Sequence, residues 1–182
     1  TMINLANVEM LRHDMPAALA WLERALEIEP SNVNAACSKS LPYFMMGDRK
    51  NGFSAAELRF EKGDPVMRLY TGAEAEWDGH ALRRDDLLVI HAEQGLGDSI
   101  MMIRFLTLTD LPRHQVVVLV QSKLLTLLTD SFPGWSFRPL EAHRKGWRGA
   151  TLRCSLMSLP YVLKAQWSVC LLYTSPSPRD CQ

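Results

Sequence analysis

Two short, continuous apolar runs constrain the fold of this chain more than any other feature. Val116–Val120 reads Val-Val-Val-Leu-Val, and residues 87–90 read Leu-Leu-Val-Ile. A strand that is apolar on both faces must be buried on both faces, which is typical of parallel sheets. Helical patterns follow the runs at residues 100–108 and 124–128, and residues 151–154 form a third candidate strand. The alternation predicts an α/β unit with a parallel sheet and right-handed crossovers.

The first part of the chain has the spacing of amphipathic helices instead. Apolar side chains recur every three or four residues over positions 15–28, which predicts a helix with one buried face. Asp14 is expected to cap this helix, Pro16 suits its first turn, and Pro30 follows its end. A partner helix is expected over residues 3–11. The connection between the two is short, so we expect them to be antiparallel.

A second helical pair is expected next, with Pro42 interrupting its first helix and a second helix over residues 49–61. Both pairs resemble tetratricopeptide repeats, whose unit of ~34 residues has small residues where the helices touch and a Pro after the second helix. The matching positions are Leu5, Ala6, Ala18, Leu22, Pro30 and Tyr43. The second unit is degenerate, because Gly52, Ala56 and Arg59 replace the Ala, aromatic and Ala positions. A generic helical hairpin is the alternative.

The pattern fades over residues 63–86, which we interpret as a linker that packs through Leu69, Tyr70 and Trp77. The expected domains are therefore helical hairpins at 1–62, this linker, and an α/β unit at 87–169. Solenoid repeats need about three units to be stable. We therefore expect more repeats before Thr1 and contact between the hairpins and the next domain.

The composition of the last segment, residues 170–182, differs from the rest, with Ser and Pro alternating. From Cys170 to Asp180 it matches the translation of a common transposase-based sequencing adapter, so we interpret this segment as non-native and the chain as a fragment. A disordered tail is the alternative. Without the tail, Cys37 and Cys154 remain, too few for a disulfide framework. A reducing, cytoplasmic setting is expected.

Composition argues against several classes of function. The chain has 20 Lys and Arg against 20 Asp and Glu, so it has no overall positive charge to attract nucleic acid. The basic and aromatic cluster at residues 143–148 is interpreted as a solvated loop. No apolar run approaches the roughly 18 residues of a membrane-spanning helix. No Cys and His spacing typical of a zinc site occurs, and no metal or cofactor is expected.

The best candidate site is the Gly-rich turn after the first buried strand, residues 91–99, because open α/β sheets bind ligands at the carboxyl ends of their strands. The turn is no dinucleotide fingerprint, since Ile100 stands in place of the third Gly, and no phosphate-binding P-loop. Glu93 and Asp98 would repel a phosphate. A carboxylate can instead take a proton from a substrate hydroxyl. A helix N-cap is the alternative role of Asp98.

The string Glu-Gln-Gly-Leu-Gly-Asp at residues 93–98 resembles the glycosyltransferase-like domain that follows tetratricopeptide repeats in many bacterial proteins. Residues 155–160 are similar to a later segment of that domain. The domain is related to heptosyltransferase-like enzymes with two facing Rossmann-like lobes, the GT-B type. The resemblance implies the first part of the N-terminal lobe. Gly97-Asp98 match a Gly-Asp whose Asp is proposed there as the base that deprotonates the acceptor hydroxyl, which attacks the anomeric carbon of a nucleotide sugar.

The resemblance implies a sugar-nucleotide-dependent glycosyltransferase whose repeats bind a protein partner. The expected catalytic residues are Asp98, Glu93 and His91, and the expected substrate-binding residues are Gln94, Gly95, Gly97 and Ser99. Glu93 would orient the acceptor or be a solvated carboxylate, and His91 would be an acid/base group or structural. The second lobe holds most nucleotide-sugar contacts, so we expect this fragment alone to be inactive. The alternative is a non-catalytic protein-interaction module.

Overall fold

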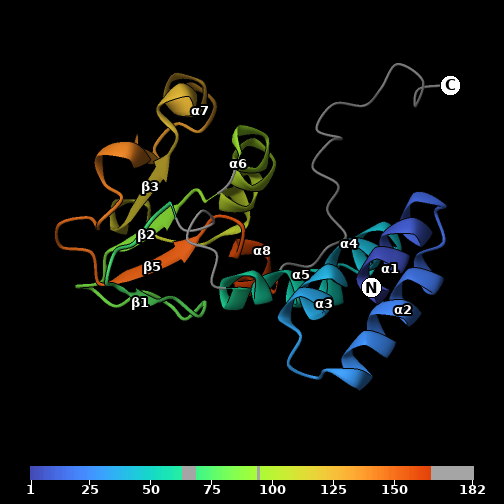
Figure 1. The fold of residues 1–182 in the computed structure, drawn as a ribbon. Coiled ribbons are helices and arrows are strands. Elements are labelled where there is room, and N and C mark those ends of the chain that lie inside the picture. The colour runs from blue at the N-terminus through green and yellow to red at the C-terminus, as the bar shows by residue number, and fades with distance from the viewer. Residues whose placement is uncertain (63–68, 94, 165–182) are drawn as a thin grey trace, which may run out of the picture.

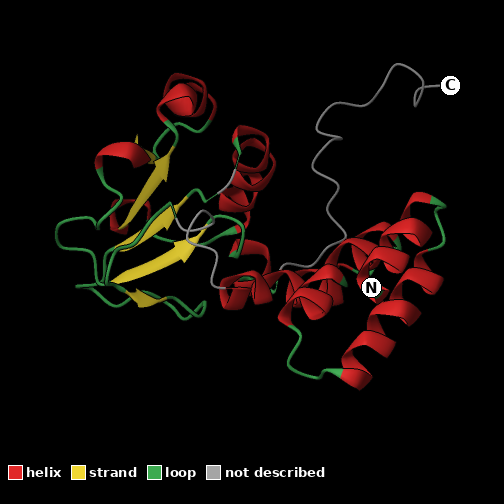
Figure 2. Cartoon of the chain, viewed as in Figure 1, coloured by secondary structure: helices red, strands yellow, loops and turns green. Residues whose placement is uncertain are grey.

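The computed structural model describes residues 1–62, 69–93 and 95–164 of the chain. An array of helices leads into an α/β unit built on one parallel sheet, as Figures 1 and 2 show. The predicted α/β class is therefore confirmed. The suspected non-native tail and Gln94 lie outside the described residues.

The first helical pair forms as predicted. Helix α1 spans Met2–Leu11 and helix α2 spans Met15–Ile28. The Asp14 carboxylate accepts a hydrogen bond of 3.0 Å from the backbone N–H of Ala17, which confirms it as the N-cap. The two helices pack through small and aliphatic side chains that are fully buried, among them Ala6, Ala18 and Leu22.

The second pair contains α3 (Val33–Ser38), α4 (Ser40–Met45), α5 (Arg49–Glu57) and the 3-10 helix η1 (Leu58–Lys62). The break between α3 and α4 lies at Lys39, one turn before Pro42. Proline cannot donate to the carbonyl of Ser38, and its ring crowds that group, so the predicted interruption occurs one turn earlier in the chain. Helix α5 begins where expected, but its last turn, predicted to be α-helical, tightens into η1. Gly52 packs so closely that a Cβ there would lie 2.6 Å from the Phe44 ring.

The sheet has five parallel strands in the order β1-β5-β2-β3-β4. The strands are β1 (Ala75–Glu76), β2 (Leu88–His91), β3 (Val116–Val120), β4 (Ser136–Pro139) and β5 (Leu152–Ser155). The predicted strands correspond to β2, β3 and β5. The edge strands β1 and β4 were not expected, and β1 lies within the segment predicted to be a linker. In that segment Tyr70 and Trp77 are buried, as predicted.

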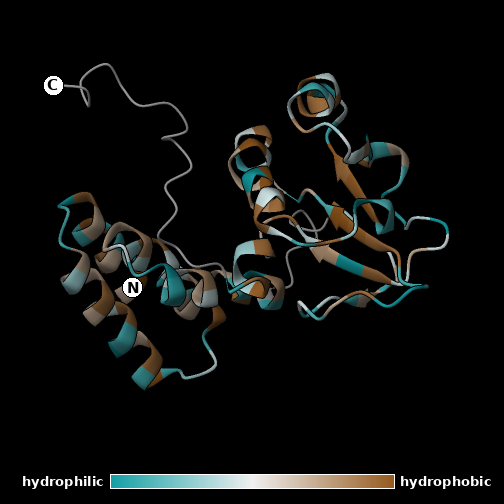
Figure 3. Ribbon diagram, turned by 180° about the vertical axis from the view of Figure 1, so that it is seen from behind, coloured by the Kyte–Doolittle hydropathy of each residue, from teal (hydrophilic) through white to brown (hydrophobic). Residues whose placement is uncertain are grey.

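Three α-helices follow strands: α6 (Leu96–Met102), α7 (Leu125–Ser131) and α8 (Leu159–Val162). The 3-10 segments in the described part of the unit are η3 (Ile103–Leu108), η4 (Arg113–Gln115), η5 (Ser122–Leu124) and η6 (Leu140–Ala142). Strand β3 is hydrophobic along its length, and β2 is hydrophobic up to His91 (Figure 3), as burial on both faces favours.

The two faces of the sheet have different covers. Leu88 and Ile90 belong to a large core cluster that contains residues of α6, η3, α7 and α8, and also Phe53 from α5. Val89 points to the opposite face, where it clusters with Tyr70 and Leu140. Because Phe53 lies in the sheet's own core, the last helix of the hairpin array packs directly on the α/β unit. The expected contact between hairpins and the next domain is therefore present.

The strand order reverses between β2 and β5. The chain passes outward from β2 through β3 to β4, then returns to place β5 on the other side of β2. Such a reversal in a parallel sheet is a topological switch point, and the loops on its two sides diverge and leave a crevice at the carboxyl ends of the strands. The first candidate for a binding site is therefore the region beyond His91 and Ser155, the last residues of β2 and β5.

Candidate functional site

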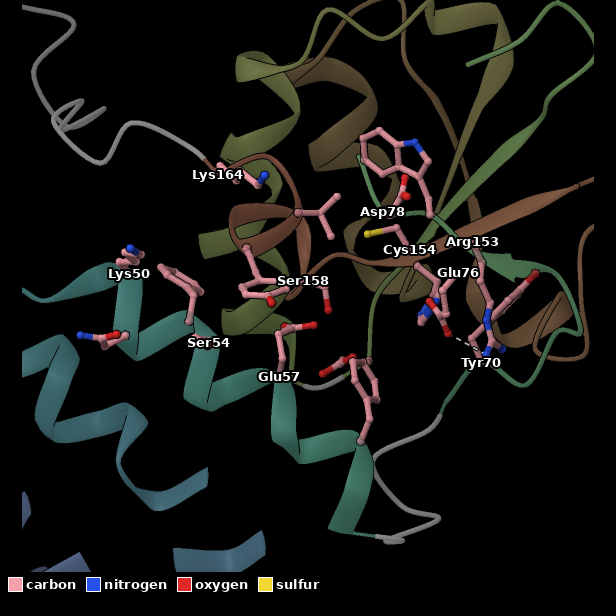
Figure 4. Close-up of a pocket in the computed structure, with 18 residues that line it drawn as sticks. Lys50, Ser54, Glu57, Tyr70, Glu76, Asp78, Arg153, Cys154, Ser158 and Lys164 are labelled. Carbon is pink, nitrogen blue, oxygen red and sulfur yellow. Dashed lines mark ion pairs between the residues drawn. The ribbon is translucent and has the colours of Figure 1, made fainter. Parts of the chain in front are cut away.

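A cavity of about 940 Å³ lies at this switch point, between the carboxyl ends of the strands and the last helix of the hairpin array (Figure 4). Helix α5 contributes one wall, and α8 with the turn after it contributes another. His91 lies in β2 and Cys154 in β5, and Glu93 and Ser158 come from the segments that follow these strands. Ligand sites for drug-sized molecules have about 300–1,000 Å³, so the cavity has the size of a small-molecule site.

Glu93 is held by a buried ion pair with Arg59, which comes from η1. The Arg59 Nε donates to Glu93 Oε1, and Nη2 donates to Glu93 Oε2 at 3.2 Å and to Ser158 Oγ at 2.8 Å. Another nitrogen, Nη1, donates to Glu57 Oε1 at 2.7 Å. One guanidinium group thus joins the helical array to the loops after β2 and β5.

The electrostatics of this group are those of a compensated buried charge. Burial alone would lower the pKa of Arg59, but the hydrogen bonds and negative charges of Glu93 and Glu57 outweigh it and raise the pKa above the ordinary value. Glu93 is 3% exposed. The interpretation of Glu93 as a solvated carboxylate is therefore wrong, because the strand end that carries it is covered by η1.

His91 is also buried, and it lines the cavity. Its ring stacks on Tyr70 with ring centroids 4.6 Å apart, and its Nδ1 lies 3.4 Å from the Ala92 carbonyl oxygen. Burial lowers the pKa of His91 to about 4, so the imidazole is neutral at neutral pH. A proton on Nδ1 faces the carbonyl group, which leaves Nε2 as a hydrogen-bond acceptor. The side chain can therefore accept a hydrogen bond from a hydroxyl group in the cavity.

The later part of the Gly-rich turn, residues 95–99, is not among the residues that line the cavity. Helix α6 begins at Leu96, so Gly95 takes the N-cap position and Asp98 lies in the first turn. The predicted capping role of Asp98 is therefore wrong in position: its Oδ2 accepts a hydrogen bond of 3.0 Å from the Gly95 backbone N–H. A carboxylate in the first turn can reach back to the free N–H groups there. The helix starts earlier than expected for this reason.

The other residues predicted to bind substrate are distributed over the same turn. Ser99 is buried, and its hydroxyl donates to Gln121 Oε1 at 2.9 Å. Gly97 is exposed, and a Cβ at this position would meet no atom within 4 Å. Gln94 lies outside the described residues. The structure thus places Glu93 and His91 among the residues that line the cavity, whereas Gly95, Gly97, Asp98 and Ser99 are not among them.

One lining group of chemical interest, the thiol of Cys154, has a structural role. Cys154 is buried, and burial raises the pKa of its thiol, so it behaves as the small apolar residue that the sequence predicts. Cys37 and Cys154 are free cysteines. In the described ranges no group of three or more His, Cys, Asp or Glu side chains could hold a metal ion. Nor, in the same ranges, is any helix long and apolar enough to cross a membrane.

Sequence reasoning did not identify Arg59 as part of the site. A signal for it was present, because Arg59 stands one repeat length after Ala25, at a position where the resemblance calls for a small residue. A charged residue that replaces a small buried one needs a buried partner. Glu93 is that partner, but the two are far apart in sequence, and only the fold brings them together.

The basic and aromatic cluster at residues 143–148 lies in a loop on the other face of the sheet, away from the cavity. The His143 and Trp147 rings are 4.5 Å apart, and the Trp147 backbone N–H donates to Glu74 Oε1 at 3.2 Å. The loop packs on the sheet through Trp147.

Comparison of the chain with protein-family models, with curated protein sequences and with solved structures finds no match.

Proposed function

We propose that this chain carries the acceptor-binding half of a sugar-nucleotide-dependent glycosyltransferase, with tetratricopeptide-like hairpins joined to the N-terminal lobe of a GT-B fold. The observation that carries the proposal is the cavity at the switch point between β2 and β5. Open parallel sheets bind their ligands at this position. The order β5-β2-β3-β4 is also the order of the first four strands in a Rossmann unit. The free cysteines are compatible with a cytoplasmic setting.

The chemical roles follow from the contacts. The acceptor binds in the cavity with one hydroxyl near His91 Nε2, and Glu93, fixed by Arg59, orients the acceptor. Asp98 uses Oδ2 for the Gly95 N–H. Among the described residues no hydrogen bond to Asp98 Oδ1 is recorded, which leaves that oxygen for a proton. Because Asp98 does not line the cavity, the reacting hydroxyl must extend out of the cavity toward the Gly-rich turn that carries Asp98.

In the proposed step the acceptor oxygen forms a bond to the anomeric carbon of the donor sugar. The bond from that carbon to the nucleotide diphosphate breaks, and the diphosphate leaves with the electron pair. The hydroxyl proton passes to Asp98, which acts as a general base. The donor is a nucleotide sugar, which the GT-B type holds mostly through its second lobe. Acceptor binding is therefore tested on the chain itself, and transfer on the chain joined to such a lobe.

Acceptor binding can be measured on the chain itself by saturation-transfer NMR with a panel of simple glycosides. We expect saturable binding of a subset, and loss of binding in S54W, because Ser54 is an exposed lining residue of α5 and an indole there obstructs the cavity. The matched control is S131W, on α7 away from the cavity. Absence of glycoside binding, or binding that survives in S54W, contradicts the proposal.

The role of Asp98 needs the chain joined to a donor-binding lobe in its uninterrupted reading frame. There Asp98→Asn should abolish transfer, because the amide takes no proton, while the fold is kept by the same hydrogen bond to the Gly95 N–H. Removal of a general base costs about 10²- to 10⁴-fold in rate. Equal activity of D98N and the parent rules out this role.

A second candidate function, binding of a protein partner by the hairpins, is favoured by exposed apolar side chains. Leu11, the last residue of α1, is 82% exposed, and Ile28, the last residue of α2, is 70% exposed, so both leave most of their apolar side chain in contact with water. Under this reading Leu11→Ser and Ile28→Ser abolish a pull-down interaction and leave glycoside binding intact. If a partner is retained by these variants, the exposed side chains do not form the interface.

A further inference from the structure

Two lysines at the cavity have no recorded partner within the described part of the chain. Lys50 lies on α5, and Lys164 lies just after α8. They are far apart in the sequence, but both line the cavity, and Figure 4 shows both on the same side of it. Both residues are exposed, so they lie at the mouth of the cavity, whereas His91 and Glu93 are buried at its inner end.

The carboxylates that line the cavity differ from these lysines, because each one has a cationic or histidine partner. The pairs are Glu57 and Glu93 with Arg59, Glu76 with Arg153, and Asp78 with His80. One guanidinium, that of Arg59, serves two of these carboxylates, so the lining as a whole has no surplus of positive charge. Lys50 and Lys164 lack such a neighbour among the described residues, so an anionic group placed beside them gains their local attraction.

The walls between mouth and inner end are largely apolar and aromatic. Phe53 and Trp77 are buried lining residues from α5 and the segment after β1, and Phe60 and Tyr161 add two further rings. The Trp77 indole N–H is already satisfied by the His80 carbonyl oxygen at 2.8 Å. Such walls bind the apolar body of a ligand by removing it from water. At the inner end His91 offers one acceptor for a hydroxyl or amine hydrogen.

We propose that the cavity binds a compact organic anion: a ring-shaped apolar body against the aromatic walls, and a carboxylate, sulfonate or phosphate group between Lys50 and Lys164. The identification of this anion as the acceptor rests on the proposed function. The anion-binding chemistry of the cavity does not depend on that function, because the lysines and aromatic rings would select the same ligand in a non-catalytic binding protein.

The test uses a matched pair of fluorescent probes, 1-anilinonaphthalene-8-sulfonate and N-phenyl-1-naphthylamine, which share a ring system and differ in the sulfonate. The sulfonate should bind more tightly, and added salt should weaken the sulfonate alone. Each exposed charge contributes modestly, so K50M and K164M should each weaken sulfonate binding about threefold, and the double variant about tenfold. Binding of the neutral probe should stay unchanged. The control variant is K123M, whose exposed lysine lies outside the cavity.

S54W should abolish binding of both probes, which assigns the signal to this cavity, and circular dichroism checks that the variant is folded. Equal affinity for the two probes overturns the proposal, as does sulfonate binding that is insensitive to K50M and K164M. Probes in which a carboxylate or a phosphate replaces the sulfonate show which of the three anionic groups binds most tightly. If the sulfonate binds in a lysine-dependent way but no glycoside binds, the anion-binding inference holds and the proposed glycosyltransferase function is refuted. If glycosides bind and neither lysine affects the binding of any probe, the proposed function holds and the anion-binding inference is refuted.

Discussion

Replacing Arg59 with Met should destabilise the protein more than any other single charge removal among the described ion pairs. The variant leaves the Glu93 carboxylate buried without its cation and removes the hydrogen bond to Ser158. The side chains of Arg59 and Glu93 are only 8% and 2% exposed, so water cannot replace the missing partner. Breaking a buried pair from one side costs about 3–5 kcal/mol.

That loss is large against the total free energy of unfolding of a typical domain, about 5–15 kcal/mol. With an m-value of about 2 kcal/mol/M in urea, a loss of about 4 kcal/mol lowers the unfolding midpoint by about 2 M. Urea titration followed by tryptophan fluorescence measures this shift, since Trp77 lies in the same core as the sheet. The variant should also lose ligand binding, because Glu93 and Ser158 line the cavity.

The matched control is Arg12→Met, which removes an exposed ion pair. Arg12 lies 3.4 Å from Glu9, and its side chain is 69% exposed, so the free energy of unfolding should change by no more than about 0.5 kcal/mol. The double variant R59M/E93M should be more stable than R59M, because no unpaired charge remains at Glu93. If R59M unfolds at the same urea concentration as R12M, the buried pair is not important for stability.

Two further predictions concern pH and packing. His91 has a pKa of about 4 in the folded protein against 6.5 for the ordinary group. Between these values the unfolded chain binds the proton and the folded one does not, so the free energy of unfolding should rise with pH by up to about 3 kcal/mol, and H91Q should remove this rise in urea titrations. Gly52→Ala should cost about 1–3 kcal/mol, because the Phe44 ring, packed on Phe53, blocks the new Cβ. Gly97→Ala in open space should instead stabilise α6 by about 0.5–1 kcal/mol, and thermal unfolding that ranks these two variants in reverse contradicts the packing argument.

The central strands and first helices could be predicted because their signals are local. Val116–Val120 is apolar at every position, and Asp14 caps the helix that follows it directly in sequence. The edge strands β1 and β4 have no such pattern. In β4 only Phe137 is buried, and the strand exists because its backbone pairs with β3. Whether such a segment forms a strand depends on pairing partners that are distant in the sequence.

The site could be predicted only in part, for the same reason. The position of His91 and Glu93 at a strand end indicated a ligand site, and both line the cavity. The opposite wall comes from α5 and α8, and no local pattern reveals that these two helices face the strand ends. The ion pair of Glu93 with Arg59 likewise depends on how the helical array packs on the sheet.

Through Phe53, helix α5 belongs to two parts of the structure. Phe53 packs on Phe44 within the helical array, and it also lies in the core on one face of the sheet. Any attempt to graft this α/β unit onto another helical array, or to express it alone, must therefore carry residues 49–62 with it. A cut directly after η1 would expose Trp77 and remove one wall of the cavity together with Arg59. The modular border for protein engineering lies before α5, inside the second hairpin.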